Sequence, residues 1–248
     1  MSHFFNTFAF LYGKINSQRQ NADNERQYKS MKKEIFECPE VFKGHNFYGF
    51  DWLEFLTAIP SPLALVTSYK SNGKANGSMQ SWFSFSSEDG FYCIFSSVHK
   101  SSHLYQTVQE TKQLAINFMS AENYAKCYST IKNNSFDKDE LQASGLTVFP
   151  ARKVSAPLVE ECFLNLECEY AWEKELFPNS DHVVMCVKIV NAWFDSDVYT
   201  NKNGGRYSES GYLYNIHSPA DPDSGAFSDT SVGIIQKFKD YPELGIEY

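Results

Sequence analysis

Hydrophobic and polar positions alternate with a period of two over much of the chain, which is the pattern of half-buried β-strands. The longest run starts at Cys162: the even-numbered positions up to Trp172 are apolar, while Glu167 and Glu169 fall on the other side. We therefore expect these two glutamates to be solvated. Further strands are expected at residues 63–69, 76–85, 91–95, 114–118 and 182–193.

Helical spacing interrupts this alternation in a few places. Leu104, Tyr105 and Val108 recur at helical spacing after residue 96, and Ser97 is a candidate N-cap for that helix. Two shorter helices are expected at residues 121–131 and 138–144. Six or more strands with two or three inserted helices predict a mainly β fold, an antiparallel β-barrel with helical insertions.

The stretch at residues 76–85 combines two kinds of side chain. Counting by two places Met79 and Phe83 on one side, and Asn76, Ser78 and Trp82 on the other. Small polar groups beside a large ring suit a ligand that is part flat ring and part polar chain. An edge strand with a solvated face is the alternative interpretation.

The segment at residues 96–103, Ser-Ser-Val-His-Lys-Ser-Ser-His, leads into the first expected helix. A helix that begins here directs free N–H groups, hydroxyl groups and Lys100 toward one place, which favours an anion. The segment lacks the glycines of a Walker loop, so a plain N-cap beside a solvated lysine is the alternative interpretation.

Composition narrows the class of protein. The 248 residues suit one large β domain with appendages or two small domains, and the net charge of −8 without a long basic run disfavours nucleic acid as a partner. The six cysteines form no Cys-x-x-Cys pair, so we expect reduced thiols in a cytoplasmic protein. The apolar stretch at residues 4–12 is too short to span a bilayer, so no membrane association is expected.

Several ionisable residues allow a chemical role as well as a structural one. His99 and His103 are four positions apart, but no third ligand follows at a supporting spacing, so no metal site is expected. Asp195 and Asp197 are interpreted as solvated. Arg206 follows two glycines and is either a solvated loop residue or a contact for a ligand phosphate.

Four segments, in this order, resemble the flavin reductase-like family of FMN-binding split barrels, to which flavoredoxin belongs. They are residues 59–67 (Ile-Pro-Ser-Pro-Leu-Ala-Leu-Val-Thr), 76–82 (Asn-Gly-Ser-Met-Gln-Ser-Trp), 99–117 (from His-Lys-Ser-Ser-His to Leu-Ala-Ile-Asn) and 181–185 (Asp-His-Val-Val-Met). The resemblance covers residues 47–214. The chain departs from the family pattern at Gly77, at His103-Leu104 and at Val187.

The resemblance implies FMN held non-covalently at the interface of a homodimer. Its phosphate would lie at the start of the helix and its ring along the strand at residues 78–82, with Asn117 bracing the site. His182 would stand near the flavin or the nicotinamide as a catalytic residue; a strand-end histidine bonded to a backbone carbonyl is the alternative. The FMN-binding residues implied are Ser78, Met79, Gln80, Ser81, Trp82, Phe83, Ser96, Lys100, Ser101, Ser102 and Asn117.

Two classes of function follow from this resemblance. One is an NAD(P)H-dependent flavin reductase or electron-transfer oxidoreductase, in which the flavin supplies the hydride chemistry and no general base is required. The other is a non-catalytic FMN-binding carrier or sensor. A third possibility is a split barrel that holds haem or pyridoxal phosphate. The domain is expected at residues 46–215, between an N-terminal extension (1–45) and a C-terminal extension (216–248).

Overall fold

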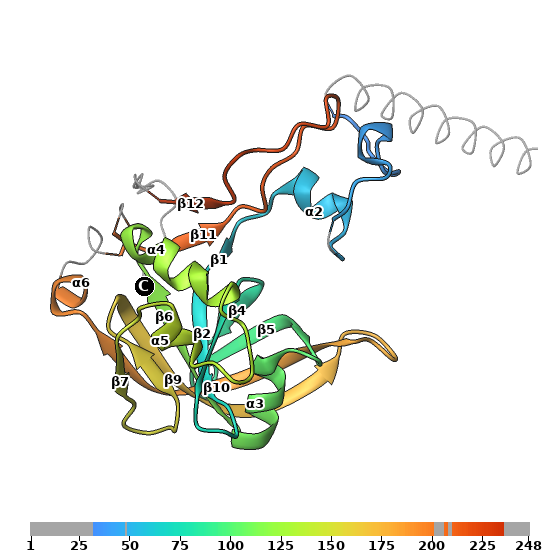
Figure 1. Cartoon of the computed structure of the whole chain (residues 1–248). Helices are drawn as coiled ribbons and strands as arrows, with labels where there is room; N and C mark the ends of the chain where they lie inside the picture. Colours follow the sequence, from blue (N-terminus) through green and yellow to red (C-terminus); the bar gives the residue numbers. More distant parts are fainter. Residues whose placement is uncertain (1–31, 48, 201–205, 208–209, 236–248) are drawn as a thin grey trace, which may run out of the picture. The chain divides into compact units, whose positions relative to one another are not determined.

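An antiparallel sheet of seven strands organises the chain (Figure 1). The structure is a computed structural model and describes residues 32–47, 49–200, 206–207 and 210–235. The chain divides into two compact units, residues 1–56 with 221–226, and residues 57–220 with 227–248. The seven-stranded sheet belongs to the second unit. The apolar stretch at residues 4–12 lies outside the described residues.

The strands of this sheet follow the order β3-β2-β6-β9-β10-β5-β4, and all neighbours are antiparallel. Their bounds are β2 (Ala64–Tyr69), β3 (Ala75–Gln80), β4 (Phe83–Ser86), β5 (Tyr92–His99), β6 (Gln113–Met119), β9 (Cys162–Glu175) and β10 (His182–Phe194). Two smaller sheets contain β1 (Ser61–Pro62), β11 (Leu213–Asn215) and β12 (Val232–Ile234), and β7 (Val148–Pro150) with β8 (Pro157–Val159).

The sheet has to close on itself because its two edge strands are consecutive in the chain. Only two residues separate Gln80 at the end of β3 from Phe83 at the start of β4. Three Cα–Cα steps span at most about 11 Å. In a flat sheet of seven strands the two edges would be about 29 Å apart. The sheet is therefore a barrel, which confirms the expected mainly β fold with helical insertions.

The single strand expected at residues 76–85 is wrong, because this stretch forms β3 and β4 with a break between them. Trp82 lies in the break with a positive φ of 58°, a left-handed conformation that interrupts a strand. The Ser96 amide and hydroxyl both donate to the Trp82 carbonyl, at 2.8 and 2.6 Å. After the break the alternation changes, and Phe83 lies in the barrel core at 5% exposure.

The helix α3 (His103–Thr111) starts later than expected. Residues 96–99 continue β5, and β10 pairs with its last two residues: Val98 lies opposite Val183, and His99 opposite His182. Ser97 is therefore a strand residue and is not the N-cap. The N-cap is Ser102, whose Oγ accepts a hydrogen bond from the Tyr105 amide at 3.2 Å. This pairing with a distant strand cannot be deduced from local periodicity.

The remaining helices of the second unit connect or cover the strands. The 3-10 helix η2 (Ser129–Ile131) extends α4 (Ala121–Tyr128), and the short α5 (Glu140–Ala143) follows it, close to the expected positions. The other helix is α6 (Ser196–Thr200), while η1 (Glu40–Phe42) belongs to the first unit and α2 (Trp52–Thr57) lies at the boundary. No helix in the described ranges has both the length and the apolar character needed to cross a bilayer.

The expectation that Glu167 is solvated is wrong. Glu167 is fully buried, and its carboxylate accepts hydrogen bonds from the amides of residues 152–154 and from the side chains of Asn191 and Trp193. The segment at residues 148–159 covers this face of β9. By contrast, Glu169, Asp195 and Asp197 are exposed, as expected. Trp172, expected on the apolar side of the same strand, is 47% exposed.

Candidate functional site

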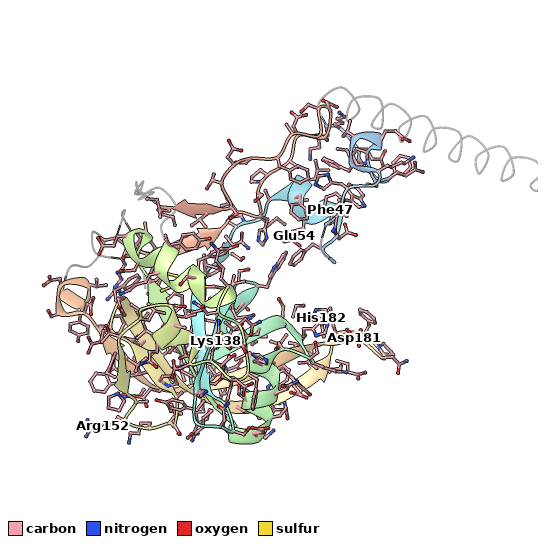
Figure 2. The ribbon with its side chains drawn as sticks, in the orientation of Figure 1. Phe47, Glu54, Lys138, Arg152, Asp181 and His182 are labelled. Carbon is pink, nitrogen blue, oxygen red and sulfur yellow. The ribbon has the colours of Figure 1, made fainter. Side chains whose placement is uncertain are left out.

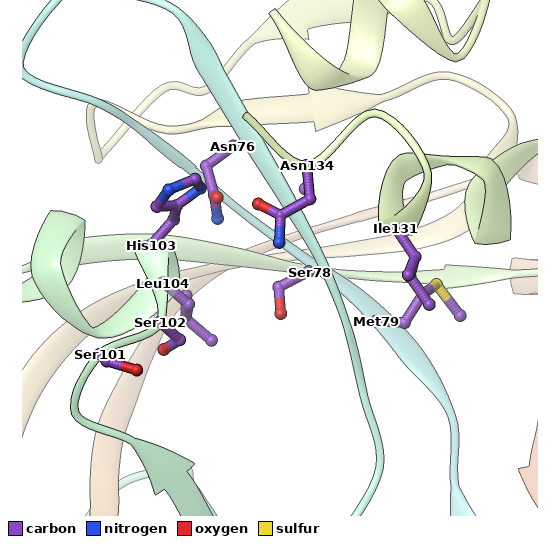
Figure 3. A pocket seen from close by; sticks show the side chains of 10 residues that line it. Asn76, Ser78, Met79, Ser101, Ser102, His103, Leu104, Ile131 and Asn134 are labelled. Carbon is purple, nitrogen blue, oxygen red and sulfur yellow. The ribbon is translucent and has the colours of Figure 1, made fainter. Parts of the chain in front are cut away.

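A small polar pocket lies between β3 and the start of α3 (Figure 3). Its volume is about 190 Å³. Three parts of the chain line it: residues 76–79 of β3, residues 101–104 at the start of α3, and Ile131 and Asn134 at and after η2. Figure 3 shows the polar side chains of Asn76, Ser78 and Asn134 gathered around one space with His103 and Ser102.

The side chain of Asn76 has an unsatisfied donor at this pocket. Asn76 is 2% exposed, and its Nδ2 has no hydrogen-bond partner in the part of the chain that the structure describes. A buried donor without a partner costs about 1–3 kcal/mol. Such a group is explained when a bound ligand accepts the hydrogen bond. The pocket therefore has a place for an acceptor atom beside Asn76.

Next to the pocket, the buried carboxylate of Glu140 contacts both the backbone of β3 and His103. Glu140 is 1% exposed and pairs with the buried ammonium of Lys70 at 2.9 Å. Its Oε2 accepts the amide of Gly77 at 2.9 Å, and its Oε1 lies 3.4 Å from His103 Nδ1. Because β3 is an edge strand, this amide has a side-chain partner in place of a further strand. Glu140 therefore holds both β3 and His103 at the pocket.

Gly77 permits this close packing. A Cβ atom at this position would lie 2.9 Å from Leu141 Cδ2 and 3.0 Å from Thr130 Cγ2, so a side chain here would require these two side chains to shift. The glycine thus allows η2 and α5 to pack closely on β3. This contact explains why the chain has glycine where the family pattern has alanine.

The start of α3 supplies further donors. Ser102 is the N-cap, and the unpaired amides of the first helical turn favour an anion. The amide and hydroxyl of Ser101 both lie within hydrogen-bonding distance of His99 Nδ1, at 3.1 and 2.8 Å. The rings of His99 and His182 meet edge to face, with centroids 4.7 Å apart. His182 therefore lies next to the pocket without lining it, near the tip of the β9–β10 hairpin (Figure 2).

Lys100 lies beside the pocket and is bound to the hairpin. Its Nζ donates to Glu175 Oε1 and to the carbonyl of Ser180, each at 2.7 Å. The hydrogen bond from Lys100 lowers the pKa of Glu175. Two of the three ammonium donors are occupied in this way, which leaves the third for another acceptor.

The other residues that the sequence analysis selected for FMN binding do not line the pocket. Gln80 donates to Ser78 Oγ at 2.7 Å, so it adjoins the pocket. Ser81 accepts from Asn215 at 3.1 Å. The Trp82 ring is 38% exposed and packs on His217 with centroids 4.5 Å apart. Phe83 faces the core, and Ser96 is bound to the backbone of Trp82.

Asn117 is fully buried and lies away from the pocket. Its Nδ2 donates to the Leu65 carbonyl and to Thr67 Oγ1, and its Oδ1 accepts from the Val159 amide and from Asn165. All four hydrogen-bonding positions of the amide are thus used. Asn117 thus links β6 to β2 and β9 by hydrogen bonds. β2 in turn pairs with β3, which lines the pocket.

The structure thus brings Ser78, Met79, Ser101 and Ser102 together in one pocket. The sequence analysis did not select Asn76, His103 or Asn134 as site residues, although the first two belong to the segments that it singled out. Asn134 had no signal in the sequence, because it reaches the pocket from a loop that only the tertiary structure places there.

The lining residues fit a small anion with hydrogen-bond acceptors. They offer amide, hydroxyl and helix N–H donors, and none of them is acidic. The volume is below the range of about 300–1,000 Å³ that is usual for a whole organic ligand. It suits a phosphate and the atoms next to it, and the rest of such a ligand would extend outside the pocket.

The chain belongs to the flavin reductase-like family. The model of the flavin reductase like domain matches residues 56–214, which is more than half of the 248 residues. This match confirms the resemblance carried by the four sequence segments, and it defines the fold as the split barrel of flavin-binding proteins.

Solved structures share this fold at low sequence identity. Component B of nitrilotriacetate monooxygenase from Bacillus cereus has a TM-score of 0.66 at 15% identity, over 85% of this chain and 100% of that chain. Flavoredoxin from Methanosarcina acetivorans has a TM-score of 0.59 at 20% identity, over 85% and 95%. The NADH:FAD oxidoreductase SgcE6 of Streptomyces globisporus has a TM-score of 0.53 at 15% identity, over 67% and 90%.

Among curated proteins, an uncharacterised protein of Methanothermobacter thermautotrophicus is 29% identical over 101 residues. The match covers 39% of this chain and 46% of that protein, so the chain spans less than half of the relative.

Proposed function

We propose that this chain binds FMN and acts as an NAD(P)H-dependent flavin reductase or electron-transfer oxidoreductase. The observation that carries the proposal is the pocket at the start of α3, where the buried Nδ2 of Asn76 lacks an acceptor. A phosphate oxygen is an acceptor that suits this donor, the hydroxyls and the helix amides. Family membership supports a flavin as the molecule that carries the phosphate.

Each residue would have a defined part in holding FMN. Asn76, Ser78, Ser101 and Ser102 would bind the phosphate, with His103 directed by Glu140. Lys100 would add its third N–H from the side of the hairpin.

The remaining proposed contacts lie along the continuation of β3. Gln80 and Ser81 would meet the ribityl hydroxyls. The backbone at residues 81–83 and the exposed ring of Trp82 would meet the isoalloxazine, since Phe83 itself is directed into the core. Met79 would supply apolar contact at the pocket wall. Asn117 and Ser96 would act indirectly, by fixing the strands and the Trp82 backbone.

When bound, the isoalloxazine supplies the hydride and electron chemistry, and the chain positions it. We propose that His182 contacts the nicotinamide or the flavin. Its support is its place beside His99, which bonds to Ser101 in the pocket. His182→Ala is expected to slow flavin reduction at least tenfold and to leave FMN affinity unchanged. Equal reduction rates in the two proteins would assign His182 a structural role only.

We also propose a homodimer with the flavin site at its interface. The β9–β10 hairpin carries Glu175 and His182 next to the pocket, and it exposes the large apolar side chains of Leu176 (50%) and Phe177 (61%). Exposed apolar groups that adjoin a site favour a contact with another protein surface.

The decisive experiment is an anaerobic titration of the purified protein. The protein is loaded with FMN, its visible flavin spectrum is recorded, and NADH or NADPH is added. Bleaching by either donor is expected for the reductase. A bound flavin that stays oxidised with both donors would favour the alternative, a non-catalytic FMN-binding carrier or sensor. Parallel titrations of the flavin-free protein with FMN, FAD and riboflavin test the phosphate pocket, and failure to bind any of them would refute both functions.

A further inference from the structure

A second cavity, of about 470 Å³, is open to solvent beside the partly exposed Phe85, Phe91 and Phe194, and shares no lining residue with the polar pocket. Its walls are almost entirely apolar and aromatic. Phe85 and Phe91 line it with their rings stacked, at 5.3 Å between centroids and 22° between planes. Phe118, Ile189, Phe194 and Tyr212 line it from β6, β10 and the segment before β11. The volume falls in the range of about 300–1,000 Å³ that is usual for organic ligands.

A cation lies close to this cavity. The guanidinium of Arg206 is 5.8 Å from the ring centroid of Phe194, and the next residue, Tyr207, lines the cavity. Burial raises the pKa of Tyr212, which also lines the cavity, and the charge of Arg206 acts in the opposite direction. Arg206 is half-buried, and its buried Nε has no hydrogen-bond partner among the described residues.

None of the acidic residues that the structure describes forms an ion pair with Arg206. An anion that accepts hydrogen bonds from a half-buried guanidinium stabilises it. Its planar fork of N–H donors matches a carboxylate in a bidentate arrangement.

The cavity and the strand break at Ser81 and Trp82 lie on opposite sides of the β1–β11 ladder. In the β1–β11 ladder, Pro62 and Tyr214 are paired and both line the cavity. The neighbouring pair is directed to the other side: Ser61 Oγ is 3.4 Å from the Trp82 amide, and Asn215 donates to Ser81 at 3.1 Å. One two-residue ladder therefore separates the cavity from the strand break.

We propose that this cavity binds a small aromatic carboxylate, with the ring between the apolar walls and the carboxylate on Arg206. The stacked Phe85 and Phe91 favour a flat apolar body, and the guanidinium of Arg206, whose Nε has no partner among the described residues, favours one negative charge. This site is additional to the proposed flavin site, and neither requires the other.

The proposal is tested by titration calorimetry of the whole purified chain with 2-naphthoate and with its neutral isostere 2-naphthamide. The carboxylate is expected to bind at least tenfold more tightly than the amide. In Arg206→Gln this preference is expected to disappear, while Arg152→Gln, at an exposed arginine beside β7, is expected to keep it.

A second pair of variants tests the cavity itself. Ala192 is exposed and lines the cavity, so Ala192→Trp is expected to fill it and to abolish binding of both compounds. Ala171→Trp places the same side chain at an exposed position of β9 that does not line the cavity, and it is expected to change nothing. Circular dichroism verifies that each variant is folded.

Three results would overturn the proposal: no binding of either compound, equal affinity for the two, or unchanged binding in Ala192→Trp. If Ala192→Trp instead dissociates an oligomer and the wild-type protein binds neither compound, the cavity is occupied by a second copy of the chain. Because FMN binding is measured separately on the same proteins, failure of this site is distinguishable from failure of the flavin site.

Discussion

Two buried polar side chains, Asn76 and Glu167, differ in whether their hydrogen-bonding groups are satisfied. Glu167 accepts five hydrogen-bond donors from three backbone amides and two side chains, so its burial stabilises the fold. Asn76 has a buried Nδ2 with no partner, so its burial costs stability in the protein alone. A structural role explains the burial of Glu167, and the ligand proposed above would explain the burial of Asn76.

Asn76→Leu is therefore expected to separate binding from stability. Removal of an unsatisfied buried donor leaves the flavin-free protein as stable as the wild type or more stable. The lost hydrogen bond to a charged phosphate weakens FMN binding by about 1.5–3 kcal/mol. Thermal unfolding and FMN titration measure the two effects, and riboflavin, which has no phosphate, is the control ligand. An FMN affinity equal to that of the wild type would remove Asn76 from the site.

Glu167 is expected to make stability depend on pH. Burial alone would raise the pKa of this carboxyl, but the hydrogen bonds from Arg152, Trp193, Asn191 and Lys153 outweigh it and lower the pKa from 4.5 to about 2. The folded protein thus holds the charged form more strongly than the unfolded chain does. This shift corresponds to about 3 kcal/mol of stability, present above pH 4.5 and lost as the pH falls toward 2.

In Glu167→Gln this contribution is absent, and the new NH₂ group opposes the donors that surround it. We expect the variant to be less stable than the wild type by about 3 kcal/mol at neutral pH in urea unfolding. The difference should narrow as the pH falls from 4.5 toward 2. Glu169→Gln, at an exposed position on the same strand, is the control. A difference that is constant with pH would contradict this account.

At the scale of the elements, the local sequence pattern predicted well whether a segment is a strand or a helix. It predicted poorly where one element ends and the next begins. The strands β2, β6 and β10 lie close to where alternation placed them. The end of β5 was misassigned because Ser96-Ser-Val-His99 has no strong alternation of its own and is a strand through its pairing with β10. As a result, the N-cap of α3 is Ser102 and not Ser97.

The position of the N-cap gives a direct test at this scale. Ser102→Ala removes the hydroxyl that accepts the Tyr105 amide and is expected to destabilise the protein by about 1 kcal/mol. It should also weaken FMN binding, because the first helical turn is less well fixed. Ser97→Ala, at an exposed position of β5, should alter neither quantity. Thermal unfolding and FMN titration of both variants provide the comparison; equal effects would place the cap elsewhere.

At the scale of the whole molecule, closure of the sheet creates the Trp82 segment. The break at Ser81 and Trp82 is where the chain passes from one sheet edge to the other, so neither residue belongs to a regular strand. Their polar and aromatic groups are thus free of strand pairing at the place where the flavin ring is proposed to bind. The barrel and the proposed site therefore depend on the same two residues.

The proposed homodimer is tested at the β9–β10 hairpin. Phe177→Glu places a charge on an exposed apolar position and is expected to convert a dimer into a monomer in sedimentation velocity, with weaker FMN binding. Lys174→Glu, at an exposed position of the same hairpin, introduces the same side chain without removal of an apolar group and should leave the assembly unchanged. A monomeric wild-type protein would refute the proposal.

The sequence by itself determined the mainly β class, most strand positions and two of the three segments that line the polar pocket, because alternation and helical spacing are local properties of the chain. Only the tertiary structure decided that Glu167 is buried, that β3 ends before Trp82, and that His103 and Asn134 face Asn76. Two of these depend on a segment distant in sequence: residues 148–159 cover Glu167, and the loop after η2 reaches β3. The break before Trp82 lies where the chain passes from one edge of the sheet to the other. Whether a residue is buried or paired depends on the segment that packs against it. A periodic pattern describes only the residue's own segment.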